Sequence, residues 1–199
     1  VVRALILLRL RTMASGRTGV RLTVAQTYCD LLNAGITPVV PEFGSLGCSG
    51  DLAPLSHCAL ALMGEGRVHD ANGIEMETAK ALAAAGIKPI ELEAKEGLAL
   101  INGTDGMLGM LIMAINDLTE LCTVADITTA MSIEGLLGTD RVFAPDLHFP
   151  LRPQVGQAQS AANIFAMLKG SPIVASHREN DSRVQDAYSL RCAPQVAGA

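Results

Sequence analysis

Aromatic residues are scarce in this sequence. They make up 3% of the 199 residues, with four Phe, two Tyr and no Trp. The hydrophobic share of 49% therefore consists mainly of Ala, Leu, Ile, Val and Met, and it is large enough for a substantial core. Ala, Leu and Met favour helices, whereas sheets draw more on aromatic and β-branched residues. The composition thus favours helix-on-helix packing over a β-sandwich.

Charge is sparse as well, at 18% of residues, and the formal net charge is −5. Nucleic-acid-binding proteins usually carry a basic surplus on one face, so we expect no nucleic-acid partner. No stretch approaches the roughly 18 uncharged apolar residues of a membrane span, so we expect no membrane partner either. The N-terminal VVRALILLRLRTM does not fit a signal peptide, because Arg3, Arg9 and Arg11 interrupt its apolar run.

The five cysteines are odd in number and widely spaced, and no CxxC pair indicates zinc or a redox couple. Reduced thiols are typical of cytoplasmic proteins, so we expect a cytoplasmic location and no metal. The chain opens inside an apolar helical pattern and stops at VAGA (196–199). We therefore expect a fragment of a longer protein.

Hydrophobic periodicity predicts a mostly helical chain. The Asn72-Gly73 pair predicts the turn of a small surface hairpin within 67–76, and the two prolines of 36–43 predict an extended loop. A continuous helix over 106–137 would be about 45 Å long, which favours an elongated bundle. The other predicted helices cover 1–13, 23–33 with Thr23 as N-cap, 51–64 with Pro54 in its first turn, 78–85 and 157–169.

The most informative stretch is GSLGCSGDLAPLSH at 44–57, three glycines directly before a helix. A phosphate cradle would use such glycines, but GxxxxGK[ST] is absent and no Lys or Arg lies between Glu42 and Arg67. A nucleophile elbow needs GxSxG after a strand, whereas Ser49 lies in GCSG after a proline-containing loop. A plain helix cap does not require so particular a sequence.

The word GSLGCSGDLAPL resembles the signature of the histidine and phenylalanine ammonia-lyase family, in which a small residue, Ser and Gly precede Asp-Leu and Pro-Leu. The resemblance implies that Cys48, Ser49 and Gly50 cyclise autocatalytically into 4-methylidene-imidazol-5-one, an electrophile made from the chain itself. No metal or soluble cofactor is then needed for the core step. The family usually has Ala where this chain has Cys48, a mild departure because that residue contributes its carbonyl group.

The residue types suit this cyclisation. The amide nitrogen of Gly50 must attack the carbonyl carbon of Cys48, and glycine lets the backbone bend into that approach. Ser49 then loses water and leaves the exocyclic methylene, whereas Ala has nothing to eliminate and Thr cannot give the same unsubstituted methylene. From its position alone, we hypothesise that Asp51 assists the proton transfers.

Two further words resemble the family, and the similarity extends over nearly all of the chain. KEGLALINGT (95–104) implies that Asn102 hydrogen-bonds the cofactor or the substrate carboxylate. RVQDAYSLRC (183–192) implies that Gln185 contacts cofactor or substrate, that Tyr188 lies beside the electrophile, and that Arg191 binds the carboxylate, which its planar charged fork suits. The alternative for Asn102 is an Asn-Gly turn or a helix-start residue. Tyr188 could instead be a core tyrosine, and Arg191 could belong to a surface ion pair.

The resemblance implies an all-α fold, a long-helix bundle of the ammonia-lyase (aspartase/fumarase-like) type, of which this chain is a central fragment. Its parts would be a cofactor-loop region (1–66), a surface hairpin with a short helix (67–94), and central helices with the substrate-binding segment (95–199). The family is homotetrameric with active sites shared between subunits. An upstream mobile-loop tyrosine, thought to act as base, is outside this chain, and Ala197 stands where a His often follows Pro-Gln-Val.

Within the family, the approach to the cofactor and the His57 position are closer to members that act on histidine. The implied activity is elimination of ammonia from L-histidine to give urocanate, with the substrate amine adding to the methylene derived from Ser49. One alternative is a phenylalanine or tyrosine ammonia-lyase or aminomutase, which would use the same electrophile. An alternative of another class is a helical scaffold fragment without activity.

Overall fold

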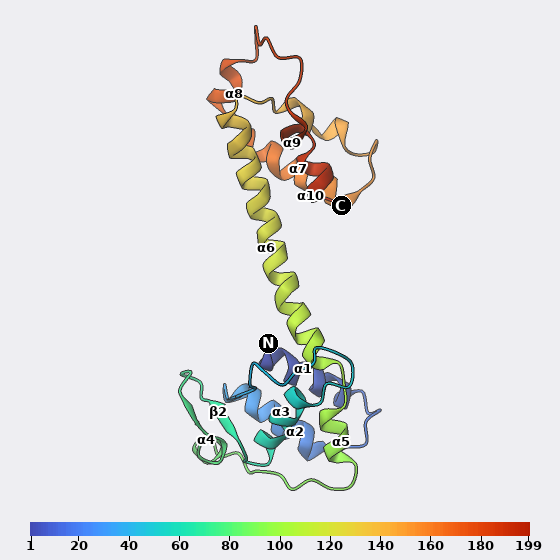
Figure 1. Cartoon of the computed structure of the whole chain (residues 1–199), viewed down its shortest axis with the longest axis vertical. Helices are drawn as coiled ribbons and strands as arrows, with labels where there is room; N and C mark the ends of the chain where they lie inside the picture. Colours follow the sequence, from blue (N-terminus) through green and yellow to red (C-terminus); the bar gives the residue numbers. More distant parts are fainter. The chain divides into compact units, whose positions relative to one another are not determined.

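The computed structural model describes residues 1–199. The chain divides into two compact units, unit 1 (Val1–Ile115) and unit 2 (Asn116–Ala199). Helix α6 (Asp105–Gly135) begins in unit 1 and continues in unit 2 (Figure 1). The other elements of unit 1 are α1 (Val2–Ala14), α2 (Leu22–Asn33), β1 (Thr37–Pro38), α3 (Ala53–Leu62), β2 (Arg67–His69), β3 (Glu75–Glu77), α4 (Thr78–Ala84) and α5 (Glu96–Ile101).

Unit 2 is built on the second part of α6 and on α7 (Val155–Leu168). The carboxylate of Asp126 on α6 accepts hydrogen bonds from Ser160 and Asn163 on α7, which ties the two helices together. An apolar cluster that includes Ile133, Phe143 and Ile164 forms its core. The remaining elements are the 3₁₀ turns η1 (Arg141–Phe143) and η2 (Pro145–Leu147) and the short helices α8 (Pro172–Ser176), α9 (Tyr188–Arg191) and α10 (Ala193–Ala197).

The core of unit 1 joins five helices, α1 to α5. On α1 the buried residues recur at steps of about four, as one face of a helix requires. They pack with buried side chains of α2, α3 and α5. One member of this buried face is charged: Arg9 is only 5% exposed. The fully buried side chains are Leu5 and Ile6 of α1, Tyr28 and Leu31 of α2, Leu55 and Leu62 of α3, and Leu100 of α5, among others.

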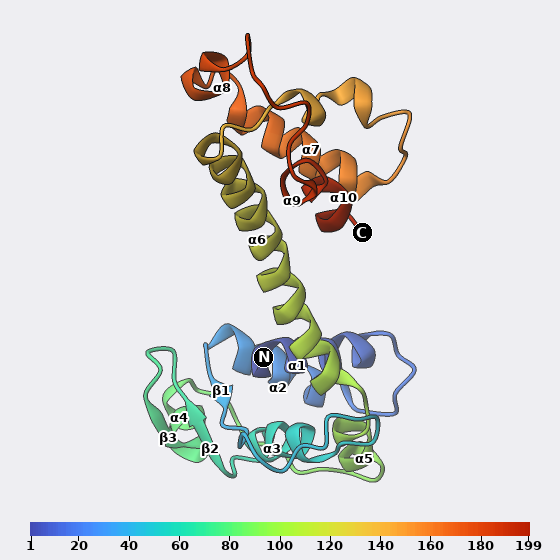
Figure 2. The same ribbon diagram turned by 45° about the horizontal axis from the view of Figure 1, so that its top comes forward.

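The predicted hairpin is confirmed, and it carries one strand more than expected (Figure 2). β2 and β3 pair antiparallel, and the carboxylate of Asp70 fixes the turn by accepting the N–H groups of Asn72 and Ile74 at 2.9 and 2.8 Å. β1 pairs with the other edge of β2, with Pro38 opposite Val68. The prediction of an extended loop there missed this pairing, because an edge strand tolerates a proline that a central strand does not.

The helices predicted from periodicity were confirmed, including the short one over 78–85, observed as Thr78–Ala84. The helix over 106–137 is observed as Asp105–Gly135, and that over 157–169 as Val155–Leu168. Two starts differ: Arg21 rather than Thr23 is the N-cap of α2, and α3 begins at Ala53 rather than at Asp51. Helices α5, α8, α9 and α10 have four to six residues, which is too short to show a periodic pattern.

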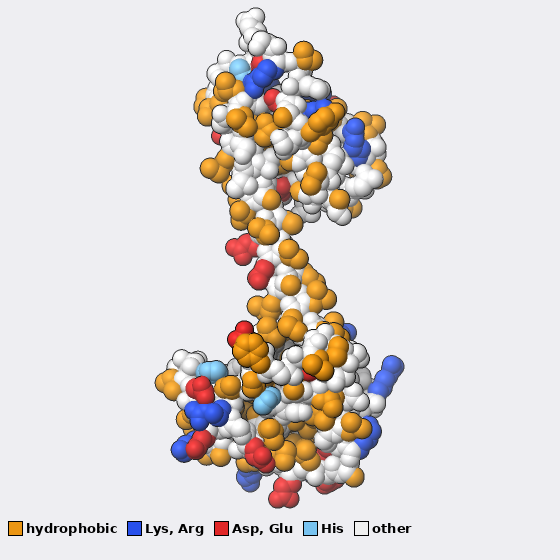
Figure 3. All heavy atoms as spheres, viewed as in Figure 1, with side chains coloured by type: hydrophobic (Ala, Val, Ile, Leu, Met, Phe, Trp, Pro, Cys, Tyr) orange, Lys and Arg blue, Asp and Glu red, His pale blue; other side chains and the backbone are white.

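The surface of α6 is unusually apolar. Leu111, Leu118 and Leu121 are each more than half exposed, and hydrophobic side chains follow the helix in Figure 3. By length and composition alone, 96–135 suffices to cross a membrane, with a mean hydropathy of 1.6 over its most apolar window. The expectation that no stretch approaches a span therefore needs correction. That expectation counted only runs without any charged residue, whereas this helix is apolar enough to span a membrane even though its apolar part includes up to two charged residues.

Candidate active site

The loop that precedes α3 is exposed and is organised by one carboxylate. Gly44, Gly47 and Gly50 have φ angles of 115°, 63° and 83°. The carboxylate of Asp51 accepts the N–H groups of Leu46 at 3.1 Å and Gly47 at 3.2 Å, and also the hydroxyl of Ser45. Asp51 therefore holds residues 45–47 in place, which form the first half of the loop and directly precede the predicted cofactor residues.

The predicted cofactor residues lie in a tight turn. The N–H of Asp51 donates to the carbonyl of Cys48 at 3.3 Å, which bends the chain back on itself at Ser49 and Gly50. No atom lies within 4 Å of the place where a Cβ on Gly50 would be. Glycine is therefore favoured at this position by its left-handed φ and not by lack of space.

Asn102 caps the C-terminal end of α5, in the same unit as the loop. Its N–H donates to the carbonyl of Leu98 at 3.1 Å, and its side chain is exposed. The loop leads into α3, and α3 packs against α5. The loop at 48–51 and Asn102 thus sit on two neighbouring helices of unit 1.

The N-terminal end of α5 is held by a buried carboxylate. Glu96 is 2% exposed, and Arg21 binds it in a fork, with Nε to Oε1 at 2.9 Å and Nη2 to Oε2 at 2.8 Å. The backbone N–H groups of Arg21 and Glu93 donate to the same carboxylate. The hydrogen bond from Arg21 is the largest cause that lowers the pKa of Glu96 to about 2. This residue carried no assignment from the sequence, and it holds α5 against the segment before α2.

The three residues predicted from the 183–192 word lie in unit 2. Arg191 stacks on Tyr188, with Cζ 4.2 Å from the ring centroid. Nε of Arg191 is buried and has no hydrogen-bond partner in this chain. In this chain Tyr188 is 71% exposed, and Arg191 forms no ion pair. Gln185 lines a cavity of about 360 Å³ together with His177 and Arg178.

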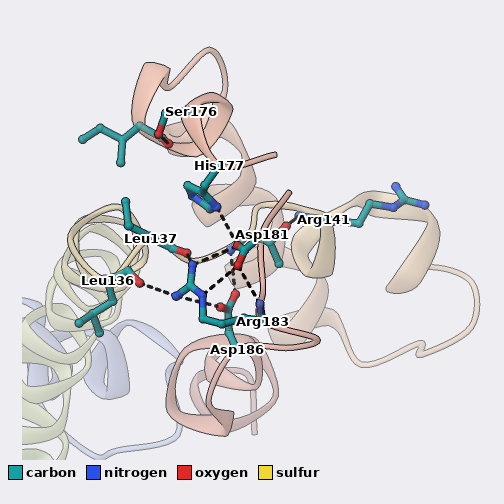
Figure 4. A network of polar contacts seen from close by, with 10 residues as sticks. Leu136, Leu137, Arg141, Ser176, His177, Asp181, Arg183 and Asp186 are labelled. Carbon is teal, nitrogen blue, oxygen red and sulfur yellow. Dashed lines mark hydrogen bonds and ion pairs between the residues drawn. The ribbon is translucent and has the colours of Figure 1, made fainter. Parts of the chain in front are cut away.

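Ion pairs around Arg183 fix the segment that precedes Gln185 (Figure 4). Arg183 donates to the carbonyl oxygens of Leu136 at 2.8 Å and of Leu137, at the C-terminal end of α6. It also pairs with Asp181, and this hydrogen bond is the largest cause that lowers the pKa of Asp181. Asp186 accepts the N–H of Thr139 at 2.7 Å. The segment is thus fastened to the end of α6 by contacts that leave Arg183 40% exposed.

Other ionisable side chains have structural surroundings. His148 is 3% exposed, with Nε2 2.9 Å from the carbonyl of Val142 and Nδ1 3.0 Å from the amide of Gln157. Both ring nitrogens are engaged, so His148 packs rather than reacts. His57 lies half-buried on α3. No group of three or more His, Cys, Asp or Glu side chains is arranged to hold a metal ion.

The predicted residues thus fall into two sets, Cys48–Asp51 with Asn102 in unit 1, and Gln185, Tyr188 and Arg191 in unit 2. Sequence reasoning missed the arginines that hold these segments, Arg9, Arg21 and Arg183. A signal existed for Arg9, since it lies four residues from Leu5 and from Met13 on an apolar helix face. Arg183 lies in a polar stretch and Arg21 between two apolar residues, and in neither place does one sequence give a sign of the partner.

Known proteins resemble the whole of this chain. Residues 1–199 match the model of the aromatic amino acid lyase family. Histidine ammonia-lyase from Streptomyces coelicolor is 66% identical over 199 residues, which are 100% of this chain and 39% of that protein. The chain therefore spans about two fifths of the length of this relative.

Solved structures agree in fold as well as in sequence. Tyrosine aminomutase from Streptomyces globisporus superposes with a TM-score of 0.85 at 42% identity, over 99% of this chain and 40% of its own. Histidine ammonia-lyase from Trypanosoma cruzi superposes with a TM-score of 0.81 at 38% identity, over 99% of this chain and 35% of its own. The mostly helical fold is thus that of ammonia-lyase structures.

Proposed function

Because the chain belongs to the aromatic amino acid lyase family, we propose that the protein containing it eliminates ammonia from L-histidine to give urocanate. The observation that carries this proposal is the 66% identity, over the whole chain, to a protein named histidine ammonia-lyase. The aminomutase named for tyrosine is 42% identical over a similar span, which favours histidine over tyrosine as the substrate.

The family uses a methylidene-imidazolone group, and we propose that Cys48, Ser49 and Gly50 form it here. The turn around these residues supports the proposal, because the N–H of Asp51 closes it onto the carbonyl of Cys48 and Gly50 within it has a positive φ of 83°. When formed, the group supplies an electrophile for the substrate amine, so that ammonia becomes a tolerable leaving group. Asp51 orders the loop through the N–H groups of Leu46 and Gly47, and it is the nearest carboxylate along the chain for the proton transfers of cyclisation.

The substrate carboxylate is assigned to Arg191. Its buried Nε lacks a partner in this chain, and a carboxylate is the acceptor that a guanidinium fork binds best. Tyr188 supports the guanidinium from one face, at 4.2 Å, and so restricts its orientation. Asn102 and Gln185 offer amide groups that both donate and accept hydrogen bonds, which suits contacts to substrate or cofactor.

The assembly and setting follow from the same proposal. We infer a homotetramer, with active sites shared between subunits, in the cytoplasm. The apolar surface of α6 supports this inference, because contiguous exposed apolar surface of this kind marks a protein interface. The partner is a small amino acid, and neither nucleic acid nor a membrane is part of the proposal.

The test uses the full-length protein with histidine, phenylalanine and tyrosine in turn. We expect ultraviolet absorbance of urocanate from histidine, and an intact mass lowered by two water molecules. Ser49→Ala should retain the far-ultraviolet circular dichroism of the helices, fail to lose the waters and lose activity. Ser56→Ala is the matched control, because this serine of α3 donates only to the carbonyl of Leu52 and should mature and turn over normally.

Three results would contradict the proposal. Turnover of phenylalanine or tyrosine without histidine would move the substrate to the alternative enzymes of the family. An unchanged mass of the wild-type protein would leave a helical scaffold without its electrophile. Normal turnover by Ser49→Ala would remove Ser49 from the chemistry.

A further inference from the structure

Asn102 is attached through its backbone to a buried arginine of a distant helix. Arg9 lies on the core face of α1, and its side chain is 6% exposed. Nη1 of Arg9 donates to the carbonyl of Asn102 at 2.6 Å and to that of Ala99 at 3.3 Å. Both carbonyls belong to the last turn and cap of α5, where a helix leaves its carbonyl groups without intrahelical partners. The guanidinium therefore completes the C-terminal end of the helix that carries Asn102.

The directional bonds of Arg9 go to these carbonyls rather than to its counter-ion. Asp105, in the first turn of α6, lies 3.5 Å from Nε of Arg9 and supplies the balancing charge in a buried site. Nε of Arg9 and Oδ2 of Asp105 nonetheless form no hydrogen bond. The position of the guanidinium is thus set by the α5 carbonyls, while Asp105 makes its burial tolerable.

The chain leaves a gap for this guanidinium. Gly103 follows Asn102 directly, and a Cβ on it would lie 2.7 Å from Nη1 of Arg9 and even closer to a carboxylate oxygen of Asp105. Real Cβ atoms essentially never approach heavy atoms so closely. A side chain at 103 would therefore have to displace the Asp105 carboxylate and the Arg9 guanidinium from their present positions.

We propose that Arg9 is a positioning residue that holds the backbone of Asn102 in the geometry for substrate binding. The proposal rests on the proposed function, in which the exposed Asn102 side chain contacts substrate or cofactor. Arg9 itself is buried and bonds the backbone of Asn102 rather than its side chain. Because one hydrogen bond at 2.6 Å joins Arg9 to the very residue that binds, its loss shifts Asn102 while the remaining core of unit 1 stays packed.

The first measurement is hydrogen exchange of the full-length protein, which needs no substrate. Arg9→Met should speed amide exchange in the peptide covering 99–108, because the end of α5 loses its tie. Arg9→Lys keeps one charged donor and should restore part of the protection. Arg3→Met is the matched control, since Arg3 lies on the same helix and donates to the carbonyl of Leu32 instead. Unchanged exchange in this peptide for Arg9→Met overturns the proposal.

The second measurement is a double-mutant cycle with Asn102→Ala, read in kcat/KM. Arg9→Met should lower kcat/KM by about tenfold to a hundredfold, as a misplacement of about 1 Å of a binding group can do. In the Asn102→Ala background the same change should cost less than about twofold, because Arg9 then has nothing to position. An equal loss in both backgrounds would show that Arg9 acts on the fold in general, and it overturns the proposal.

Burial of an unpaired Asp105 can prevent Arg9→Met from folding. In that case the pair Arg9→Met with Asp105→Asn removes both charges, and it is measured against Asp105→Asn alone in the same cycle. A wild-type protein that turns over another aromatic amino acid instead of histidine contradicts the proposed substrate alone, and the cycle is then run on that amino acid.

Discussion

The segments 96–105 and 181–191 both carry predicted substrate-binding residues, and they are held in different ways. The first lies against the core of unit 1, with Leu100 fully buried and Glu96 2% exposed, and arginines fasten both of its ends. The second is fastened by ion pairs at the surface of unit 2, where Arg183 is 40% exposed and Val184 fully exposed.

This difference indicates how each binding residue keeps its position. Asn102 is positioned by packing and by hydrogen bonds that water does not screen, so its geometry should depend little on ionic strength. Gln185 follows a segment whose charges are open to solvent, where salt weakens the attraction between them. The four tests below probe this contrast, from the largest expected effect to the smallest.

Truncation of the buried side chain at 100 should have the largest effect. Leu100→Ala removes methyl and methylene groups from a fully packed site, and should lower the free energy of unfolding by about 2–5 kcal/mol. Val184→Ala, in the surface segment, should change it by less than about 0.5 kcal/mol. Urea unfolding of the full-length variants at one fixed protein concentration measures both. Equal losses at the two sites would break the contrast.

Acid should weaken the buried segment through Glu96. Its folded pKa of about 2 lies below the ordinary Glu value of about 4.3, so the carboxylate contributes stability above pH 4.3 and loses it as the pH falls toward 2. The melting temperature of the wild type should therefore fall across this window. Glu96→Gln should melt lower at neutral pH, and should have a smaller fall on acidification.

The effect of salt on stability should differ between Glu96 and Asp181, the corresponding carboxylate of the other segment. The pKa of Asp181 is also lowered, mainly by the hydrogen bond from the exposed Arg183. Arg183 and Arg21 are each 40% exposed, but the Asp181 side chain is 28% exposed and that of Glu96 only 2%. Raised ionic strength should therefore shrink the stability lost in Asp181→Asn more than that lost in Glu96→Gln. Glu93→Gln serves as control, since this carboxylate is 65% exposed. Equal salt sensitivity at 96 and 181 would contradict the contrast.

Loss of the surface arginine should have the smallest effect. Arg183→Gln removes solvent-screened ion pairs and two bonds to the end of α6, and we expect KM to rise about twofold to fivefold with little change in kcat. The rise should diminish at high salt. Arg141→Gln breaks a more exposed pair with Asp146, which does not involve the segment before Gln185, and should leave KM unchanged. A loss confined to kcat would place Arg183 closer to the chemistry than its contacts indicate.

The fold could be predicted as far as long-range periodicity reaches. The long helix after Asp105, the α7 helix and the Asn72-Gly73 hairpin all follow from local patterns that need no knowledge of neighbours. Strand β1 and helix α5 could not be found in this way. The first depends on pairing with a strand some thirty residues away, and the second on arginines drawn from distant parts of the chain.

The residues of the candidate site likewise fall into those that local sequence predicts and those that depend on distant contacts. Words such as CSGDL and QDAYSLR carry the reactive residue types in sequence order, so family resemblance indicated Cys48, Ser49, Gly50, Asn102, Gln185, Tyr188 and Arg191. Partners that act through backbone carbonyls leave no such word, because any residue type supplies a carbonyl. Arg9 and Arg183 are both of this kind, and only coordinates show which carbonyl each one meets.

The close approach at Gly103 has a consequence for how this sequence can drift. Every other amino acid carries a Cβ, so position 103 admits no conservative replacement while Arg9 and Asp105 keep their places. A side chain there becomes tolerable only when the Asp105 carboxylate and the Arg9 guanidinium have both moved or been replaced by something smaller. Position 103 is thereby coupled to residues 9 and 105, and a library that varies position 103 alone would record it as intolerant without revealing that two side chains elsewhere are the cause.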